Sequence, residues 1–259
     1  MTRDIKVRNI LLLTATITPK SGVPNLQRID PRQRLRDYEK AFSFYLLLLN
    51  QYCDAIIFAE NSNSDVSSLK KLAIDKGLSD QVEFLVFDGL DYPSHYDRGY
   101  GEFKLVDYAM ANSQVLIEQD KRSVIWKITG RYIVKNIHQI ISCQPQNFDV
   151  YCNCRNFPKH WVDMFLIAWT PEAYKACLQN VYDRLKTNVP EVPYGTASEE
   201  LLRTWFEQQP QSIRFKSRFS TTPEVEGIRG GDNTGYSTDN RWKFYLRNSL
   251  NWLMPWLWI

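Results

Sequence analysis

The chain has 259 residues, a formal net charge of +3, and 44% hydrophobic and 24% charged residues. This length supports the core of one large domain, and the composition excludes a disordered chain. The small net charge, without a block rich in lysine or arginine, excludes a general nucleic-acid-binding protein. No run reaches the roughly twenty apolar residues that a transmembrane helix needs.

The cysteines predict a reducing, cytoplasmic environment. There are five of them, an odd number, and the N-terminus carries no secretory signal. Cys152 and Cys154 are expected to be reduced strand thiols, one facing each side of the sheet. His95, His138 and His160 show no ligand spacing and are expected to be structural or exposed.

The first half of the chain alternates strand and helix patterns. Residues 8–13 form an apolar run that ends at Thr14 and Thr16, and Asp30-Pro31 predicts the start of a helix whose apolar stripe includes Tyr45. A second strand, residues 54–59, ends at a polar tip over residues 60–65, whose last residue, an aspartate, can cap the next helix. A third strand covers residues 82–87. This alternation predicts a mostly parallel, doubly wound α/β sheet flanked by helices.

The stretch from Gly99 to Val134 is the centre of the prediction. Gly99 and Gly101 predict a tight turn just before a helix, where free amide groups favour an anion. The strand at residues 123–126 then ends in a polar tip, Lys127-Ile-Thr-Gly-Arg-Tyr132. Ligands of open α/β sheets bind beyond the carboxyl ends of the strands, so this tip is a candidate binding site. The alternative is that Lys127 and Arg131 are solvated loop charges.

The second half predicts strands at residues 148–154 and 159–169. Thr170-Pro171-Glu172 predicts the opening of a helix over residues 173–186. Another helix begins at Ser198 and includes Trp205 and Phe206. A polar, glycine-rich loop follows at residues 227–235.

This ordering resembles the GT-A glycosyltransferases of bacterial surface-polysaccharide synthesis. Residues 14–18, 60–65, 99–104 and 127–132 stand at four places where that fold holds its nucleotide-sugar donor. The resemblance covers residues 8–207 in layout and only these short motifs in sequence. It implies a GT-A-like (Rossmann-like) fold and transfer of a sugar from a nucleotide diphosphate, with a UDP-hexose, and within that class UDP-galactose, as the expected donor.

The chain departs from that family at the fourth place. Where the family carries the Asp-X-Asp motif that holds a metal and the donor diphosphate, this sequence has Lys127, Thr129 and Arg131. Two cations can neutralise a departing diphosphate directly, because arginine in particular matches phosphate oxygens with two hydrogen bonds. The expectation is therefore a metal-independent enzyme without cofactor, with Mg²⁺ or Mn²⁺ as the open alternative.

Roles follow from the chemistry and the resemblance. An inverting enzyme needs a carboxylate to deprotonate the acceptor hydroxyl, and Asp163, Glu199 and Glu200 are the candidates. Asp163 can instead be a structural hydrogen-bonding group, and the two glutamates can be ordinary first-turn helix acids. The candidate donor-binding residues are Thr14, Thr16, Glu60, Asn61, Asp65, Gly101, Lys104, Lys127, Thr129, Gly130, Arg131 and Arg229, and the tip at residues 60–64 can also be a plain turn.

The chain is expected to divide into a GT-A-like domain over residues 1–240 and an aromatic and basic segment over residues 241–259. That segment interleaves tryptophans with Arg241, Lys243 and Arg247, which is typical of an interfacial membrane anchor. Packing on the main domain or on a partner chain is the alternative.

The predicted protein is thus a cytoplasmic glycosyltransferase, peripheral at the inner face of the bacterial plasma membrane. It would build a surface glycan, such as an O-antigen or capsule, on a lipid-linked or oligosaccharide acceptor, without nucleic acid as a partner. A different nucleotide-dependent α/β transferase and a non-catalytic carbohydrate-binding module are the rival interpretations.

Overall fold

The computed structural model describes residues 7–117 and 123–236, and in addition Trp242, Tyr245, Ser249, Leu250, Leu253 and Trp258. The strands are β1 (Arg8–Ala15), β2 (Ala55–Glu60), β3 (Val82–Val86), β4 (Ser123–Thr129), β5 (Ile133–Val134), β6 (Val150–Arg155), β7 (Trp161–Trp169), β8 (Phe215–Lys216) and β9 (Val225–Glu226). The α-helices are α1 (Pro31–Leu46), α2 (Ser67–Asp75), α3 (Asp97–Asn112), α4 (Gln114–Ile117), α5 (Ile137–Ser142), α6 (Pro171–Ala173) and α7 (Ser198–Glu207). The short helical turns are η1 (Ser79–Gln81), η2 (Ser94–Tyr96), the π-helical η3 (Tyr174–Leu178) and η4 (Val181–Arg184).

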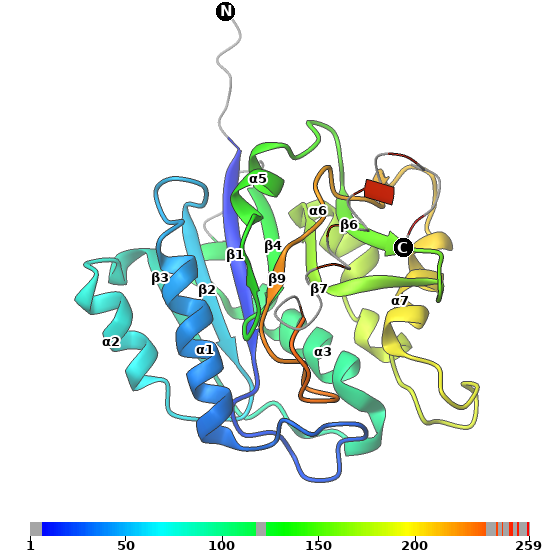
Figure 1. Ribbon diagram of the computed structural model, residues 1–259, viewed down its shortest axis with the longest axis horizontal. Helices are drawn as coiled ribbons and strands as arrows, with labels where there is room; N and C mark the ends of the chain where they lie inside the picture. The colour runs from blue at the N-terminus through cyan, green and yellow to red at the C-terminus, as the bar shows by residue number, and fades with distance from the viewer. Residues whose placement is uncertain are drawn as a thin grey trace, which may run out of the picture.

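A mostly parallel sheet lies at the centre of the molecule (Figure 1). Within the described residues it has seven strands in the order β3-β2-β1-β4-β7-β6-β8, and β7 is the strand that runs against its neighbours. β5 and β9 form a separate two-stranded sheet. The expectation of a mostly parallel α/β sheet flanked by helices is confirmed.

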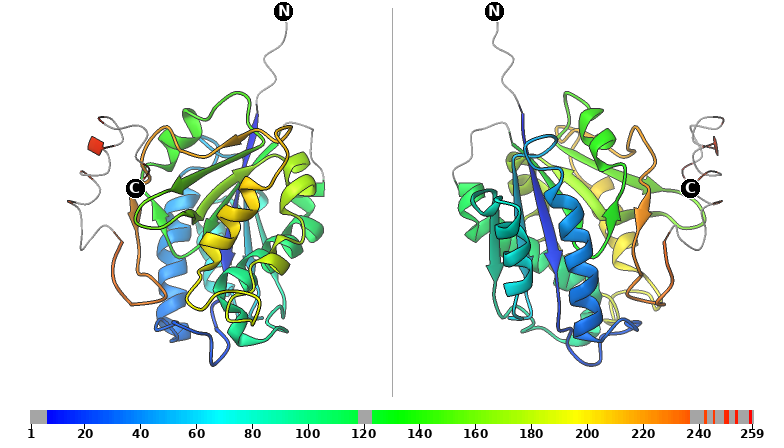
Figure 2. Two further views of the ribbon diagram at one scale, coloured as in Figure 1. Left: turned by 90° about the vertical axis from the view of Figure 1, so that its right-hand side faces the viewer. Right: turned by 60° about the vertical axis from the view of Figure 1, so that its left-hand side comes forward.

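Each face of the sheet is covered by helices. Because successive side chains of a strand point to opposite faces, Leu11 and Leu13 of β1 pack with α1, α2 and α5, whereas Ile10 and Leu12 pack with α3 and α7. The two further views show these helices on either side of the sheet, with α7, in yellow, lying across β7 (Figure 2, left). The result is a three-layer α/β/α domain.

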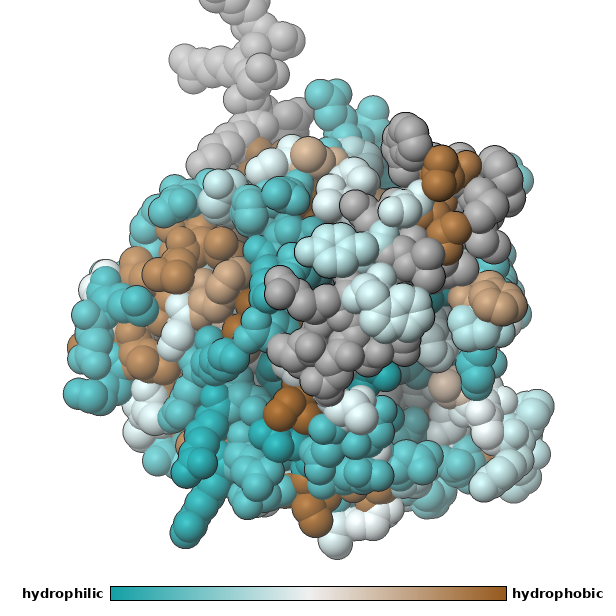
Figure 3. All heavy atoms as spheres, viewed as in Figure 1, coloured by the Kyte–Doolittle hydropathy of each residue, from teal (hydrophilic) through white to brown (hydrophobic). Residues whose placement is uncertain are grey.

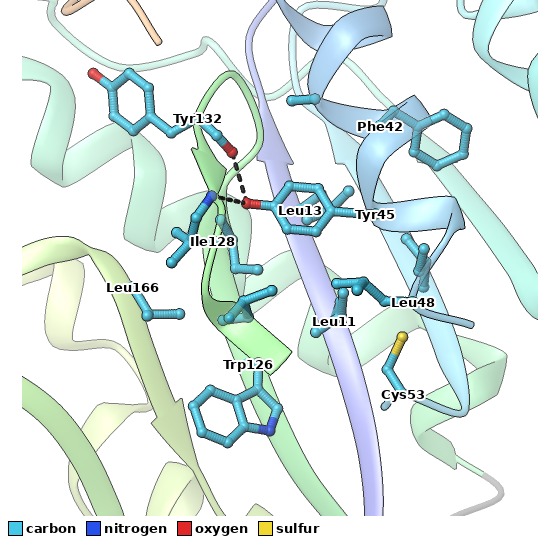
Figure 4. Packing of buried hydrophobic residues seen from close by; sticks show 14 of the residues in the cluster. Leu11, Leu13, Phe42, Tyr45, Leu48, Cys53, Trp126, Ile128, Tyr132 and Leu166 are labelled. Atoms are coloured by element: carbon cyan, nitrogen blue, oxygen red, sulfur yellow. Dashed lines mark hydrogen bonds between the residues drawn. The ribbon is translucent and has the colours of Figure 1, made fainter. Parts of the chain in front are cut away.

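Helix α1 begins as the sequence predicts. The Asp30 carboxylate accepts hydrogen bonds from the backbone amides of Arg32 and Gln33, and Pro31 occupies the first helical position. Tyr45, on the buried stripe of α1, donates its hydroxyl proton to the carbonyl of Tyr132 at 2.7 Å and accepts the amide of Val134 at 3.0 Å (Figure 4). This pair of bonds ties α1 to the segment that follows β4.

Several local predictions were wrong. Gly99 and Gly101 lie inside α3, which begins at Asp97, rather than in a turn before it. β4 extends beyond residue 126 to Thr129, so Lys127 belongs to the strand and not to its tip. The reason is that β4 pairs on both edges through this region, with β1 and with β7.

The helix expected over residues 173–186 is also broken. Its opening is as predicted, because the Thr170 hydroxyl accepts the amide of Ala173. The chain then passes through a π-helical turn, and Asn180 takes a left-handed conformation with φ 59°. The Asp107 carboxylate of α3 accepts hydrogen bonds from the Tyr174 hydroxyl and the Asn180 amide, and these contacts stabilise the interruption.

Cys152 and Cys154 do not face opposite sides of the sheet. Residues two apart in a strand share a face, and both thiols lie in the core on the α3 and α7 side with their sulfur atoms 3.7 Å apart. The pair is free of a disulfide in this structure.

The proposed division at residue 240 stays a prediction, because most of residues 241–259, including Arg241, Lys243 and Arg247, lie outside the described residues. Trp258 is described and packs on the main domain. Its carbonyl accepts the amides of Asn156 and Phe157 at 2.8 and 3.1 Å, and its ring lies 5.4 Å from the Arg203 guanidinium. Among the described residues no helix is long and apolar enough to cross a membrane.

Candidate active site

The candidate site lies at the carboxyl edge of the sheet, where β1 and β4 lie side by side. The chain adds β2 and β3 on one side of β1 and then places β4 on the other, which makes this position the topological switch point. Thr14 is opposite Thr129, and Ala15 is opposite Glu60. The predicted tips of β1, β2 and β4 therefore do meet.

A pocket opens at this edge, which we call the edge pocket. It encloses about 690 Å³ of space between its walls, part of it open to solvent. Its polar lining consists of Thr14, Thr16, Lys20, Arg34, Asp97, Arg98, Glu102, Thr129 and Arg131. Its apolar lining includes Pro19, Val23, Leu26, Tyr38 and Leu105.

Glu102 of α3 joins the tips of β1 and β4. Its Oε1 accepts the hydroxyls of Thr14 and Thr129, each at 2.7 Å, and lies 2.6 Å from Nζ of Lys127. Burial acts to raise the pKa of Glu102, but the charge of Lys127 and these hydrogen bonds outweigh it and hold that pKa below its usual value.

Lys127 is therefore not the open cation at a strand tip that the sequence predicted. Its side chain is fully buried and is paired with Glu102, and its ammonium also donates to the carbonyl of Met164 at 2.5 Å. A buried ammonium needs such partners because its desolvation is costly. Its charge is already neutralised by a protein carboxylate.

Two other cations remain available to an anion. Arg34 of α1 and Arg131 after β4 are 5% and 7% exposed and both line the edge pocket. Arg34 donates to the carbonyls of Thr16 and Arg28, and Arg131 donates to the carbonyl of Ile228 at 2.9 Å. Within the described part of the chain, neither guanidinium forms an ion pair with a carboxylate.

Arg131 has a buried N–H group without a protein partner. Its Nε forms no hydrogen bond although the atom is inaccessible to solvent. Leaving such a group unsatisfied costs about 1–3 kcal/mol, and more when it is charged. Burial also lowers the pKa of Arg34, and the nearby charge of Arg131 acts in the same direction. The two neighbouring guanidiniums make this part of the pocket positively charged, which favours an anion.

Glycines allow close approach around the pocket. A Cβ atom on Gly101 would lie 1.8 Å from the Tyr92 hydroxyl, and one on Gly130 would lie 2.9 Å from the carbonyl of Thr14. Gly130 also donates its amide to that carbonyl. The two glycines are thus packing positions, and the anion-binding turn expected at Gly101 is not present.

The polar groups at the tip of β2 form hydrogen bonds within the protein. Glu60 is fully buried and accepts the backbone amides of Ile17, Ser62 and Ser64, so it connects the loops after β1 and β2. Asn61 accepts the Thr16 hydroxyl at 2.7 Å. Neither Glu60 nor Asn61 lines the edge pocket; they support the loop that does.

Asp65, Lys104 and Arg229 lie away from the pocket lining. Asp65 is exposed and accepts the amide and hydroxyl of Ser67 at the start of α2, which lowers its pKa. Lys104 pairs with Asp91 on the surface. Arg229 pairs with Asp232 at 3.8 Å and stacks on Tyr236 in the glycine-rich loop.

The glycine-rich loop, residues 227–235, nevertheless contacts the edge pocket through its backbone. The carbonyl of Ile228 accepts a hydrogen bond from the Arg131 guanidinium, and the carbonyl of Gly230 accepts hydrogen bonds from the backbone amides of Gln27 and Arg28. The backbone of residues 228–230, and not the Arg229 side chain, is the part of the loop next to the pocket.

The three candidate catalytic carboxylates have different surroundings. The Asp163 side chain on β7 is 8% exposed. It accepts hydrogen bonds from the side chains of Asn153 at 2.7 Å and Arg155 at 2.8 Å, which is the pattern of a structural hydrogen-bonding group. Glu200 pairs with Lys159 at 2.9 Å and accepts the amide of Ala197 at the start of α7.

Glu199 has no ion-pair partner within the described residues. It is half-buried, and desolvation raises its pKa, with Asp97 and Glu102 adding to the shift and Arg98 opposing it. Asp97, Arg98 and Glu102 line the edge pocket, whereas Glu199 is not among the lining residues; it is the candidate carboxylate whose pKa these pocket charges affect.

Sequence reasoning missed five charged pocket residues: Lys20, Arg34, Asp97, Arg98 and Glu102. Arg34 lies in a polar, arginine-rich stretch that offered no reason to choose one arginine. Asp97 has φ 71° and ψ 174°, a region of backbone conformation that is essentially restricted to glycine and costs about 1–3 kcal/mol for other residues. A single sequence carries no signal for such a conformation.

No protein-family model matches the sequence, and no curated protein matches it. The chain is similar to the solved structure of the inositol-1-phosphate CTP transferase from T. maritima, with 10% identity and a TM-score of 0.45 over 90% of this chain and 93% of that one. It is also similar to a glycosyltransferase involved in glycosylation of the major capsid of PBCV-1, with 11% identity and a TM-score of 0.42 over 83% of each chain. A third similarity, at 8% identity and a TM-score of 0.42 over 95% of this chain and 79% of that one, is to glucosyl-3-phosphoglycerate synthase from Mycobacterium tuberculosis.

Proposed function

We propose that this protein is a glycosyltransferase that moves a sugar from a nucleotide-diphosphate donor to a growing bacterial surface glycan. The observation that carries the proposal is the pair of buried arginines that line the edge pocket, Arg34 and Arg131, neither of which has a carboxylate partner in the described chain. A diphosphate supplies the opposite charge and oxygen atoms that can accept hydrogen bonds from guanidinium groups.

The reaction follows from the charges. The bond between the anomeric carbon and the diphosphate oxygen breaks, and its electron pair stays on the departing diphosphate. Arg34 and Arg131 stabilise that developing charge, with Lys20 and Arg98 as further cations of the same pocket. The nucleoside lies toward Thr14 and Thr16, beside the apolar lining.

Glu199 is the proposed base. In an inverting reaction the acceptor hydroxyl attacks the anomeric carbon, and its proton passes to this carboxylate. The raised pKa of Glu199 favours the role, because a general base works best when its pKa approaches the operating pH. Asp163 and Glu200 are assigned structural roles.

We propose that the reaction needs no metal. The residues at the end of β4 are cations and hydroxyls, and the nearest carboxylate, Glu102, is engaged by Lys127, Thr14 and Thr129. Among the described residues no group of three histidines, cysteines or acids could hold a metal ion. The donor we assign is a UDP-hexose, with UDP-galactose as its first representative.

The acceptor is proposed to be lipid-linked, at the cytoplasmic face of the membrane. Trp242, Tyr245 and Leu253 of the C-terminal segment are 61%, 60% and 60% exposed. On the face shown in Figure 3, hydrophilic residues cover much of the surface, and a brown apolar group lies at the upper right, where the red part of the chain lies in Figure 1. Exposed aromatic and apolar side chains, in a segment whose sequence also contains Arg241, Lys243 and Arg247, are typical of an interfacial contact.

The test is a thermal-shift titration with UDP, GDP, CMP and dTDP, each with EDTA and with Mn²⁺. A ligand that binds the native state raises the melting temperature, by the equivalent of about 2.7 kcal/mol at a hundred times its Kd. We expect one diphosphate to give the same shift in EDTA and in Mn²⁺. Arg131→Ala should abolish the shift, and Arg131→Lys should retain only part of it, because lysine lacks the planar fork.

Arg214→Ala is the matched control, because Arg214 is a surface arginine paired with Asp149 and lies outside the pocket lining. It should bind the nucleotide like the unmodified protein. A shift that appears only with Mn²⁺ would favour a metal-dependent nucleotidyltransferase instead. Glycan binding without any nucleotide shift would favour a carbohydrate-binding module, and either result overturns the proposal.

A further inference from the structure

Asp97 occupies a backbone conformation that its side chain disfavours. With φ 71° and ψ 174° it lies in a region that glycine adopts and other residues avoid. The chain places an aspartate there, and that aspartate lines the edge pocket. Glycine at this position would have the same backbone without the strain. Aspartate therefore adds only its carboxylate to the pocket, at the cost of that strain.

The surrounding contacts hold Asp97 in this conformation. Its amide donates to the carbonyl of Ser94, and the Asn188 side chain donates to the carbonyl of His95 at 3.0 Å. On the other side, Gly99 packs so closely on α7 that an added Cβ would lie 2.3 Å from the Cβ of Ser198. Because both flanks are fixed, the backbone at Asp97 has no freedom to relax.

The Asp97 carboxylate keeps hydrogen-bonding capacity. Its nearest charged partner is the adjacent Arg98, at 3.5 Å, which is longer than a good hydrogen bond. The side chain is 19% exposed, and it acts electrostatically on Glu199, the proposed base. The carboxylate thus lines the pocket and is close enough to Glu199 to affect its pKa.

We infer that Asp97 binds hydroxyl groups of the sugar that the donor carries. This inference rests on the proposed function. The sugar is joined to the diphosphate, so it must lie in the same pocket as the phosphate-binding arginines, and Asp97 lines that pocket with Arg34 and Arg131. A carboxylate accepts hydrogen bonds from sugar hydroxyls, and it repels phosphate.

Asp97 therefore distinguishes the intact donor from the free nucleotide. The sugar hydroxyls give the donor an attractive contact with the carboxylate that the nucleoside diphosphate product lacks. The product also has one more negative charge beside the same carboxylate, so Asp97 favours binding of the donor over retention of the product.

The test compares the affinities of UDP and UDP-galactose by isothermal titration, in EDTA. In the unmodified protein both should bind. In Asp97→Asn the affinity for UDP-galactose should fall about tenfold or more, the usual effect of losing a charged hydrogen bond, while the affinity for UDP stays the same or rises. Asp97→Glu should restore part of the loss. Asp75→Asn, an exposed acid on α2, is the matched control and should change neither affinity.

A second variant separates this role from a structural one. Asp97→Gly should raise the melting temperature by about 2–4 °C, because it removes the strain, and should lose the same preference for UDP-galactose. Asn180→Gly, at a left-handed position outside the edge pocket, should leave the preference for UDP-galactose over UDP unchanged.

Three results would overturn the inference: Asp97→Asn weakening UDP and UDP-galactose equally, Asp97→Asn leaving both unchanged, or Asp97→Gly binding UDP-galactose like the unmodified protein. Absence of UDP binding in the unmodified protein would instead overturn the assignment of a UDP-hexose donor; the comparison would then be repeated with the nucleotide that does bind, and absence of binding to every nucleotide would overturn the proposed function.

Discussion

At the scale of single residues, Glu199 and Glu200 show how far neighbours in one helical turn can differ. Glu200 faces Lys159 and the start of its own helix, and these contacts use its carboxylate. Glu199 is desolvated, which raises its pKa, and the negative charges of Asp97 and Glu102 act in the same direction. From the sequence alone the two residues were equivalent candidates for the catalytic base. Their tertiary contacts within the described residues show that only Glu200 is held in an ion pair.

Glu199 should make stability depend on pH. Because its pKa is raised in the folded state, its contribution to stability is fully present below the unfolded value, about pH 4.3, and is lost as the pH rises through the folded value. We therefore expect Glu199→Gln to raise the melting temperature at pH 7, with the gain shrinking toward pH 4. Thermal denaturation across this range measures it.

Glu200→Gln serves as the control and should give no gain at pH 7, since it removes an ion pair and a helix-start contact. A gain in Glu199→Gln that is independent of pH, or a loss at pH 7, would contradict the assignment of Glu199 as a desolvated carboxylate. Loss of sugar transfer in the same variant would be the expected cost of this stabilisation.

At the scale of elements, α3 determines the geometry of the site. It supplies Asp97, Arg98 and Glu102 to the edge pocket from its first two turns. Gly99 and Gly101 let these turns pack closely on Ser198 and Tyr92. The glycines were identified from sequence as important, but they serve helix packing rather than a phosphate-binding turn.

Gly101→Ala tests this packing role. Helix propensity alone predicts that alanine stabilises an α-helix by about 1 kcal/mol relative to glycine. Here the added methyl group would lie 1.8 Å from the Tyr92 hydroxyl, so we expect a net destabilisation of about 1–3 kcal/mol, measured by urea denaturation. The double variant with Tyr92→Ala should lose less than the sum of the single changes. A Gly101→Ala protein as stable as the parent would disprove the close contact.

At the scale of the whole molecule, the described end of the chain returns to the domain. Trp258 packs near Arg203 and Arg218, whereas Trp242 and Leu253 expose most of their side chains. The segment over residues 241–259 thus combines a docked end with exposed apolar groups, among which the sequence places Arg241, Lys243 and Arg247.

This combination predicts binding to anionic membranes. We expect the protein to sediment with phosphatidylglycerol vesicles and less with phosphatidylcholine vesicles, and we expect salt to weaken the binding, since each cation contributes about 1 kcal/mol near the surface. Replacing Arg241, Lys243 and Arg247 with glutamate should abolish it. Equal binding to both vesicle types, or binding unaffected by this charge reversal, would refute the membrane contact.

The sequence by itself determined the layers of this protein. Apolar runs of strand length alternate with helical stripes, and signals such as Asp30-Pro31 act over only a few residues, so the α/β class and the start of α1 follow from local patterns. The carboxyl ends of β1, β2 and β4 were also predictable, because parallel strands align their ends at one edge.

Only the tertiary structure decided which charges are available at that edge. Lys127 and Arg131 are equivalent in sequence, yet Lys127 is neutralised by Glu102 and Arg131 lies beside another buried arginine. Asp97 likewise has its unusual backbone because contacts from distant segments fix both of its flanks. A side chain's charge partner and its solvation depend on residues far away in the chain, and no local pattern encodes them.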